Sequence, residues 1–208
     1  TGPDMRAQLL DAEVSTLDAV LYTHGHADHV HGLDDLRQIV FNRRKRLPVW
    51  APPDTADQLR RRFDYAFVAE PGSLYPPILD LHEIDGPVTV EGAGGPITAQ
   101  PFTVEHGPIP ALGFRFGPVA YLPDVSAMTA EAWGAVGDLD CWIVDALRYE
   151  PHGTHSHLAQ TLDWIGQAAP RRAVITNMHI DLDYDRVAAE TPPHVTPAYD
   201  GMVLTFAV

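Results

Sequence analysis

The sequence predicts an α/β protein in which two sheets are covered by helices, a layered sandwich. Up to residue 86, apolar runs of strand length alternate with helix-like segments. After residue 86, short strand candidates follow one another closely and are separated by Gly and Pro turns. The 208 residues are 45% hydrophobic and 20% charged, which is typical of a globular protein. We therefore expect a single domain over residues 1–208.

The first part of the chain predicts two strand and helix pairs. A helix-like segment opens the sequence within "TGPDMRAQLL". Residues 19–22 are a strand candidate followed by a helix over residues 29–41, and residues 48–51 are a strand candidate followed by the helix-like "DTADQLRRRF". The helices are expected on the outside of the sheets.

The later part predicts closely spaced strands and then a return to alternation. The strands are expected within "PVTV", "ITAQPFTVE", "LGFRF" and "VAYLPD". They are followed by a helix in "AMTAEAWGAV", a strand in "CWIVDAL", a helix in "SHLAQTLDWIGQA", a strand in "RRAVIT" and a final strand in "MVLTFAV". The 19 prolines and 16 glycines lie mostly between these runs, so they mark turns and not disorder.

Charge and cysteine content exclude several classes of partner. The net charge of −14 argues against binding to nucleic acid or to an anionic membrane, because phosphate binding depends on clustered Lys and Arg. Cys141 stands alone in an apolar run, so no disulfide can form within the chain, which fits a cytoplasmic protein. No apolar run reaches transmembrane length and no leader sequence is expected.

A cluster of possible metal ligands follows the first strand candidate, in "YTHGHADHVHG". His24 and His26 flank Gly25, which permits a tight turn, so both imidazoles can converge on one point beyond the strand end. Asp28 and His29 follow where a helix would begin and can face a second point nearby. Zinc binds imidazole nitrogen and carboxylate oxygen at about 2.0 to 2.2 Å, and catalytic zinc sites leave one position for water. The spacing HxHxDH therefore predicts two adjacent half-sites, with a chance set of structural histidines as the less favoured alternative.

Further ligand candidates lie at the ends of other predicted strands. They are His106 in "FTVEHG", Asp124 in "YLPD" and His179 in "VITNMHID". Strand ends on one rim of a sheet can bring together residues that are far apart in the sequence. Each of the three could be a turn residue by itself, but together they complete a two-metal site.

These motifs resemble those of the metallo-β-lactamase superfamily, whose signature HxHxDH is present as His24, His26, Asp28 and His29. The similarity covers most of the chain and is strongest to the branch that holds the cyclic phosphodiesterase of the carbon–phosphorus lyase pathway, with ribonuclease Z more distant. The supporting motifs are "TGPDMR", "VEHG", "YLPDVS", "DALRYEPHGTHSHL" and "PAYDG". The resemblance implies a four-layer αββα sandwich. It also implies strands ahead of "TGPD", so the first strands of the fold are expected to be missing here.

By position, the resemblance implies two divalent ions bridged by a hydroxide. One ion would be held by His24, His26, His106 and Asp124, and the other by Asp28, His29, His179 and a shared Asp124. In the relatives the last ligand directly follows the threonine of its strand, whereas Asn177 has that place here. His179 is preferred because a neutral amide is a poor zinc ligand. Zinc is the expected metal, with manganese and iron as alternatives.

His155, in "RYEPHGTHSHL", is the candidate for proton transfer. In phosphodiester hydrolysis the departing alkoxide needs a proton, which an imidazole of near-neutral pKa can supply. Asp28, which makes the motif a two-metal pattern, and His155 are therefore the predicted catalytic residues. Asp145 ends the strand in "CWIVDA" and is expected either to orient a metal-bound histidine or to cap a turn.

Neighbouring polar residues are expected to have plainer roles. His152 and His157 are predicted as loop and helix-cap residues, and His31 as a residue that points away from the site. Arg148 is predicted to pair either with a substrate phosphate or with Glu150.

The sequence therefore predicts a cytoplasmic dinuclear metallohydrolase of a small phosphodiester, with a ribose cyclic phosphate as one candidate substrate. A lactone or thioester hydrolase is the second interpretation, because the same hydroxide attacks a carbonyl carbon. A non-catalytic metal-binding accessory protein is the third. A long RNA substrate is disfavoured by the acidic charge, and a homodimer is left open.

Overall fold

The chain divides into two compact units, Thr1–Pro96 and Ile97–Val208. The computed structural model describes residues 1–207. Each unit has a buried apolar core of its own. This division does not test whether residues 1–208 form a single domain, so the single domain stays a prediction.

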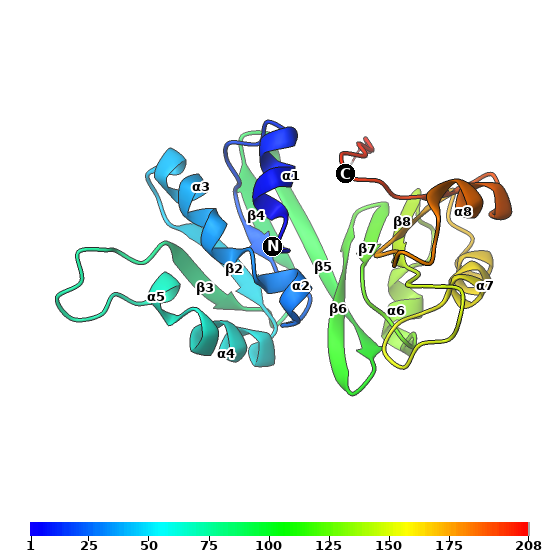
Figure 1. Cartoon of the computed structure of the whole chain (residues 1–208), viewed down its shortest axis with the longest axis horizontal. Helices are drawn as coiled ribbons and strands as arrows, with labels where there is room; N and C mark the ends of the chain where they lie inside the picture. The colour runs from blue at the N-terminus through cyan, green and yellow to red at the C-terminus, as the bar shows by residue number, and fades with distance from the viewer. Residues whose placement is uncertain (208) are drawn as a thin grey trace. The chain divides into compact units, whose positions relative to one another are not determined.

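The first unit is built on a small parallel sheet. Its strands β1 (Val20–Leu21), β2 (Leu47–Ala51) and β3 (Leu79–Glu83) lie in that order. The helices are α1 (Met5–Asp11), α2 (Ala27–Val30), the 3-10 helix η1 (Leu33–Asp35), α3 (Leu36–Arg43), α4 (Pro53–Arg62) and α5 (Asp64–Phe67), and α3 and α4 lie beside the sheet in Figure 1. In β2, buried Leu47, Val49 and Ala51 alternate with half-buried residues, so one face of the strand packs into the core. Leu36 of α3 and Leu59 of α4 belong to the same buried cluster.

The helix expected over residues 29–41 is interrupted at Gly32, which corrects the sequence prediction. A Cβ atom at Gly32 would lie 2.2 Å from the carbonyl oxygen of Gly2. The backbone N–H of Gly32 donates a hydrogen bond to the carbonyl of Thr1 at 2.8 Å. Because the opening segment of the chain approaches so closely at this point, the predicted helix is divided into α2, η1 and α3.

The second unit is built on the larger sheet, in which six neighbouring strands lie in the order β10-β9-β8-β7-β6-β5. They are β5 (Gly95–His106), β6 (Ile109–Phe116), β7 (Val119–Leu122), β8 (Cys141–Asp145), β9 (Arg172–Thr176) and β10 (Val195–Pro197), and β4 (Val88–Gly92) precedes them in the chain. The helices are α6 (Ala130–Ala135), α7 (Leu158–Ala168) and α8 (Tyr184–Glu190). β6 is antiparallel to both β5 and β7, and the pairs from β7 to β10 are parallel. The carboxyl ends of β5, β7, β8 and β9 therefore lie at one edge of the sheet.

The core of the second unit anchors these strand ends. Phe102, Leu122, Trp142 and Ile175 are buried and belong to β5, β7, β8 and β9 respectively. Each lies a few residues before a polar residue that ends its strand or follows it closely. The apolar part of each strand therefore fixes the position from which the polar residue projects.

Several further segments differ from the sequence predictions. Strands β3 and β10 and helices α5 and α8 were not predicted. Residues 202–207 of "MVLTFAV" form no strand, and Val208 lies outside the described residues. Val195–Pro197 is the strand that pairs with β9 instead. An apolar run forms a strand only where a neighbouring strand offers hydrogen-bond partners, and within the described residues the run at 202–207 pairs with none.

The helices are short, and α7 has only 11 residues. Within residues 1–207, none combines the length and the apolar character needed to cross a lipid bilayer.

Candidate metal centre and active site

The histidine loop of the first unit follows β1 directly. The backbone N–H of Tyr22 donates to the carbonyl of Trp50 at 2.8 Å, which continues the pairing of β1 with β2 by one residue. The chain then passes through buried Thr23 and His24, and His26 is the N-cap residue of α2. The loop therefore begins at the carboxyl end of a strand and ends at the start of a helix, as the sequence predicted.

The structure brings the four residues of the HxHxDH motif together within the first unit. The ring centroid of His24 lies 4.6 Å from that of His26 and 4.4 Å from that of His29. The side chain of Asp28 is 63% exposed, and its Oδ2 lies 3.3 Å from His29 Nε2. Thr23 Oγ1 lies 3.0 Å from His24 Nδ1. This contact orients the His24 ring and makes Nε2 the nitrogen that would bind a metal ion.

Helix α4 supports the histidine loop, and this support was not predicted from the sequence. Arg62 Nη1 donates to the carbonyl of Gly25 at 2.7 Å, and Arg62 Nη2 donates to Gln58 Oε1 at 3.1 Å. A Cβ atom at Gly25 would lie 2.5 Å from Gln58 Oε1, so the glycine leaves room for the end of the Gln58 side chain. On the same loop, Thr1 Oγ1 donates to the carbonyl of His29 at 3.0 Å. In the sequence, Arg62 is a basic residue in the last turn of a helix. Many helices end in this way, so the pattern does not show which group Arg62 binds.

His106 and Asp124 form a buried pair in the second unit. His106 ends β5, Asp124 follows β7, and their side chains are 0% and 1% exposed. His106 Nδ1 donates to the carbonyl of Thr154 at 2.6 Å, since a carbonyl can only accept. His106 Nε2 lies 3.4 Å from Asp124 Oδ2. A buried imidazole and a carboxylate side by side at strand ends are ligands that zinc prefers.

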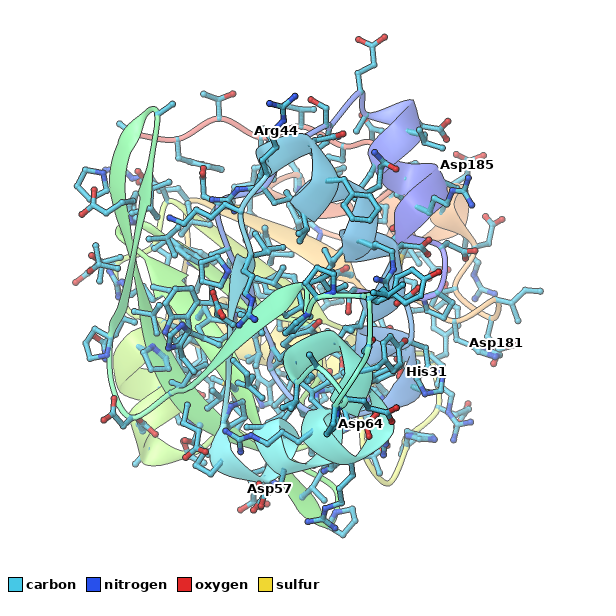
Figure 2. All side chains as sticks on the ribbon, turned by 90° about the vertical axis from the view of Figure 1, so that its left-hand side faces the viewer. His31, Arg44, Asp57, Asp64, Asp181 and Asp185 are labelled. Carbon is cyan, nitrogen blue, oxygen red and sulfur yellow. The ribbon has the colours of Figure 1, made fainter. Side chains whose placement is uncertain are left out.

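After β9 the structure places Asn177, and not His179, beside Asp124. Asn177 Nδ2 donates to Asp124 Oδ1 at 3.2 Å and to the carbonyl of Pro123 at 3.3 Å. The side chain of His179 is 52% exposed, and its Nδ1 lies 3.3 Å from Oδ2 of Asp181, which is at the surface in Figure 2. His179 as the last ligand stays a prediction, and this arrangement does not bring it to Asp124.

A second imidazole lies next to His106. The ring centroids of His106 and His155 are 4.7 Å apart, and His155 Nδ1 lies 3.0 Å from Asp145 Oδ2. Asp145 is the last residue of β8, is fully buried, and also accepts from the backbone N–H of Val125 at 3.2 Å. Burial raises the pKa of Asp145 to about 6, although the hydrogen bond from His155 acts in the opposite direction. Of the two predicted roles, Asp145 has the first in part, because it orients a histidine. That histidine is His155, which is not a predicted metal ligand.

Replacing Asp145 with asparagine is expected to change how the stability of the metal-free protein depends on pH. The pKa of Asp145 in the folded state, about 6, lies above the ordinary aspartate pKa of 3.8, so the folded state binds this proton more tightly than the unfolded state does. The contribution of Asp145 to stability is therefore present below the unfolded-state pKa and is lost as the pH rises through about 6. Asparagine does not titrate. The melting temperatures of the variant and of the wild type are measured by circular dichroism at about pH 4.5 and at about pH 7.5. The difference between them, variant minus wild type, should be larger at the higher pH. The same difference at both pH values would contradict a raised pKa.

The other predicted polar residues have plainer positions. His157 caps α7 through Nδ1, which confirms its predicted role. His152 Nδ1 accepts a hydrogen bond from a backbone N–H within its own loop. Arg148 donates to two backbone carbonyls, one of them that of Glu150, so the predicted pairing with the Glu150 carboxylate does not form. His31 is exposed, as Figure 2 shows.

The comparisons with known proteins cover nearly the whole chain. A family model described as the beta-lactamase superfamily domain matches residues 1–180. A crystal structure described as a new diphosphatase from the PhnP family has a TM-score of 0.89 and 31% sequence identity, with 100% of this chain and 79% of that chain covered. The short form of human tRNase Z has a TM-score of 0.68 at 16% identity, with 100% and 86% covered, and shares the fold.

Two curated relatives are longer than this chain. The octanoyltransferase of Porphyromonas gingivalis (strain ATCC BAA-308 / W83) is 36% identical over 206 residues, which are 97% of this chain and 40% of the relative. The ribonuclease Z of Mycobacterium sp. (strain KMS) is 29% identical over 126 residues, which are 55% of this chain and 44% of the relative. The chain therefore spans less than half the length of either curated relative.

The family match includes the HxHxDH loop, His106 and Asp124. Both units are mixed α/β structures in which helices flank the sheets, in agreement with the solved relatives. The predicted fold class and the predicted family are thereby confirmed. The chain belongs to the metallo-β-lactamase superfamily of hydrolases.

Proposed function

We propose that this protein is a metal-dependent hydrolase that cleaves a small phosphodiester. The observation that carries the proposal is the position of His155, which is held by the buried carboxylate of Asp145 and lies beside the ligand candidate His106. Phosphodiester cleavage needs such a group, because the departing alkoxide must be protonated. The relative with 31% identity and a solved structure is likewise named for a phosphate substrate, since it is described as a diphosphatase.

The proposed cofactor is a pair of divalent ions, with zinc as the first expectation and manganese or iron as alternatives. The proposed ligands are His24, His26, His106 and Asp124 for one ion, and Asp28, His29 and the shared Asp124 for the other, with His179 as the remaining candidate. The donor set fits a metal, because His24 and His106 are each held at Nδ1 by an oxygen atom, as metal-bound histidines usually are. When bound, the ions would stabilise charge on the phosphate oxygens and activate the attacking water.

The proposed role of His155 is to donate a proton to the leaving oxygen from Nε2. Asp145 accepts the hydrogen bond from Nδ1, so the ring is fixed in one tautomer with Nε2 as the nitrogen that exchanges protons. His155 is therefore ready to act as a general acid without reorienting.

The proposed substrate is small. A long RNA depends on many Lys and Arg contacts to its phosphates, whereas this chain has 14 Lys and Arg against 28 Asp and Glu. A ribose cyclic phosphate or a short diphosphate ester needs only the metals and a few side chains. We therefore propose a small-molecule partner and neither a long nucleic acid nor a membrane.

A second candidate function is hydrolysis of an acyl ester or thioester. The observation in its favour is the relative named octanoyltransferase, which is 36% identical over 97% of this chain. An activated water that attacks phosphorus can also attack a carbonyl carbon. Because the chain spans only 40% of that relative, the name is weaker support than the geometry around His155.

The test is metal content measured on the same purified sample that is assayed for hydrolysis. The substrates are bis-p-nitrophenyl phosphate, a ribose cyclic phosphate, a short diphosphate ester and an octanoyl thioester. Turnover of a phosphate substrate that disappears with a chelator and returns with zinc is the expected result. Turnover of the thioester alone would support the second candidate, and bound metal without turnover of any substrate would support an accessory protein.

A further inference from the structure

Asn177 occupies a distinctive position in the second unit. It directly follows β9 at the edge of the sheet where the carboxyl ends of β7 and β8 also lie. Its φ is 59°, a left-handed conformation that asparagine adopts more readily than most residues. This conformation turns the chain at once after the strand, and the Asn177 side chain contacts Asp124.

The hydrogen bonds of Asn177 fix the orientation of its amide. The two groups within reach of Nδ2 are the carbonyl of Pro123 and the carboxylate of Asp124, and both can only accept. The amide therefore presents N–H donors, and not its oxygen, to Asp124. A group oriented in this way does not act as a ligand on that side, because a metal ion requires a lone pair.

The two oxygens of Asp124 consequently have different surroundings. Oδ2 lies 3.4 Å from Nε2 of His106, a proposed ligand. Oδ1 accepts from Asn177 Nδ2 at 3.2 Å, so an N–H donor, and not a metal-binding atom, lies beside this oxygen. The Asn177 hydrogen bond also withdraws part of the carboxylate charge from any ion on that side.

His179 is held by other contacts. Its backbone N–H donates to the carbonyl of Leu147 at 2.8 Å, and its half-exposed ring lies beside Asp181. Within residues 1–207, no group of three or more closely spaced candidate ligands includes His179.

We propose that Asn177 makes the two metal positions unequal, because it supplies no ligand where the last ligand of the second ion is expected. The second ion would then bind more weakly than the ion held by His106 and would exchange with the surroundings. This inference rests on the proposed function and deepens it, because hydrolysis would then depend on the concentration of free metal. Changing one ligand or its immediate support commonly alters metal affinity by about 10- to 100-fold. We expect the two dissociation constants of the wild type to differ by at least about 10-fold.

The test is a titration of the metal-free protein with zinc in competition with a chromophoric chelator, which measures stepwise binding without substrate. Asn177→Asp keeps the size of the side chain and replaces its N–H donor by a carboxylate. It should tighten the second binding step by about 10-fold or more and leave the first unchanged. Asn177→His supplies an imidazole in its place and should act in the same direction, so that failure of one variant to fold leaves the other as a test. His179→Ala tests the remaining candidate ligand, and the inference expects it to change neither step. His194→Ala, at an exposed histidine with no proposed role, is the matched control and should also change neither step.

Equal binding of two zinc ions by the wild type would overturn the inference. Loss of the second ion in His179→Ala, with no gain in either Asn177 variant, would also overturn it. Assays of the same samples separate this outcome from failure of the proposed function. Two equal sites with phosphodiester turnover would reject only the inequality, whereas unequal sites without turnover of any phosphate substrate would reject only the phosphodiesterase.

Discussion

Replacing His26 with alanine is expected to abolish metal-dependent hydrolysis, with kcat/KM lowered by at least about 1000-fold. His26 is an exposed residue that precedes α2, so its removal should leave the fold intact. Its ring lies 4.6 Å from that of His24, and the proposed ion depends on both imidazoles. The measurement is kcat/KM together with zinc per chain, determined by elemental analysis.

His31→Ala is the matched control for this experiment. His31 is also exposed, lies on the same segment five residues later, and is not a proposed ligand. It should retain activity within about twofold of the wild type and keep its zinc. Full activity in His26→Ala would remove the HxHxDH loop from the proposed site, and equal losses in both variants would point to a general disturbance of the loop.

Replacing His155 with alanine is expected to slow the reaction by an amount that depends on the leaving group. A sugar alkoxide leaves slowly without a proton, so turnover of a ribose cyclic phosphate should fall by about 100- to 10,000-fold. p-Nitrophenolate is a weak base that leaves unprotonated, so kcat for bis-p-nitrophenyl phosphate should fall by less than about 10-fold. Zinc content should stay at the wild-type value, because His155 contacts Asp145 and is not a proposed ligand.

His152→Ala distinguishes a general acid from a loop effect. His152 lies in the same loop, with its ring 5.4 Å from that of His155. Its replacement should affect both substrates alike and by a small factor. Equal losses for the two leaving groups in His155→Ala would show that His155 binds the phosphate and does not donate a proton.

The part of the site that could be predicted from the sequence is the part that is local. His24, His26, Asp28 and His29 lie within six residues, and their spacing around Gly25 and a helix start is enough to bring them together. His106 and Asp124 are not local to this loop, and they were found because each lies where an apolar run ends. The α/β class followed from the alternation of these runs with helices.

What could not be predicted depends on contacts between distant segments or on backbone angles. The interruption at Gly32 arises from the close approach of Gly2, thirty residues earlier. The contact of Asn177 with Asp124 goes together with a positive φ at residue 177, which no pattern in the sequence indicates. The pairing of Asp145 with His155 depends on the path of the loop between them, which carries no periodic pattern.

The loop after β8 holds two adjacent residues to two different strands. The carbonyl of Thr154 accepts from His106 at the end of β5, and the next residue, His155, bonds Asp145 at the end of β8. A shift of one residue in this loop would therefore misplace a proposed metal ligand, His106, and the proposed acid, His155, at the same time. Residues 150–153 are exposed and precede these anchors. Attempts to engineer a new substrate preference should therefore vary the segment 150–153 in sequence and length, and keep Thr154 and His155 unchanged.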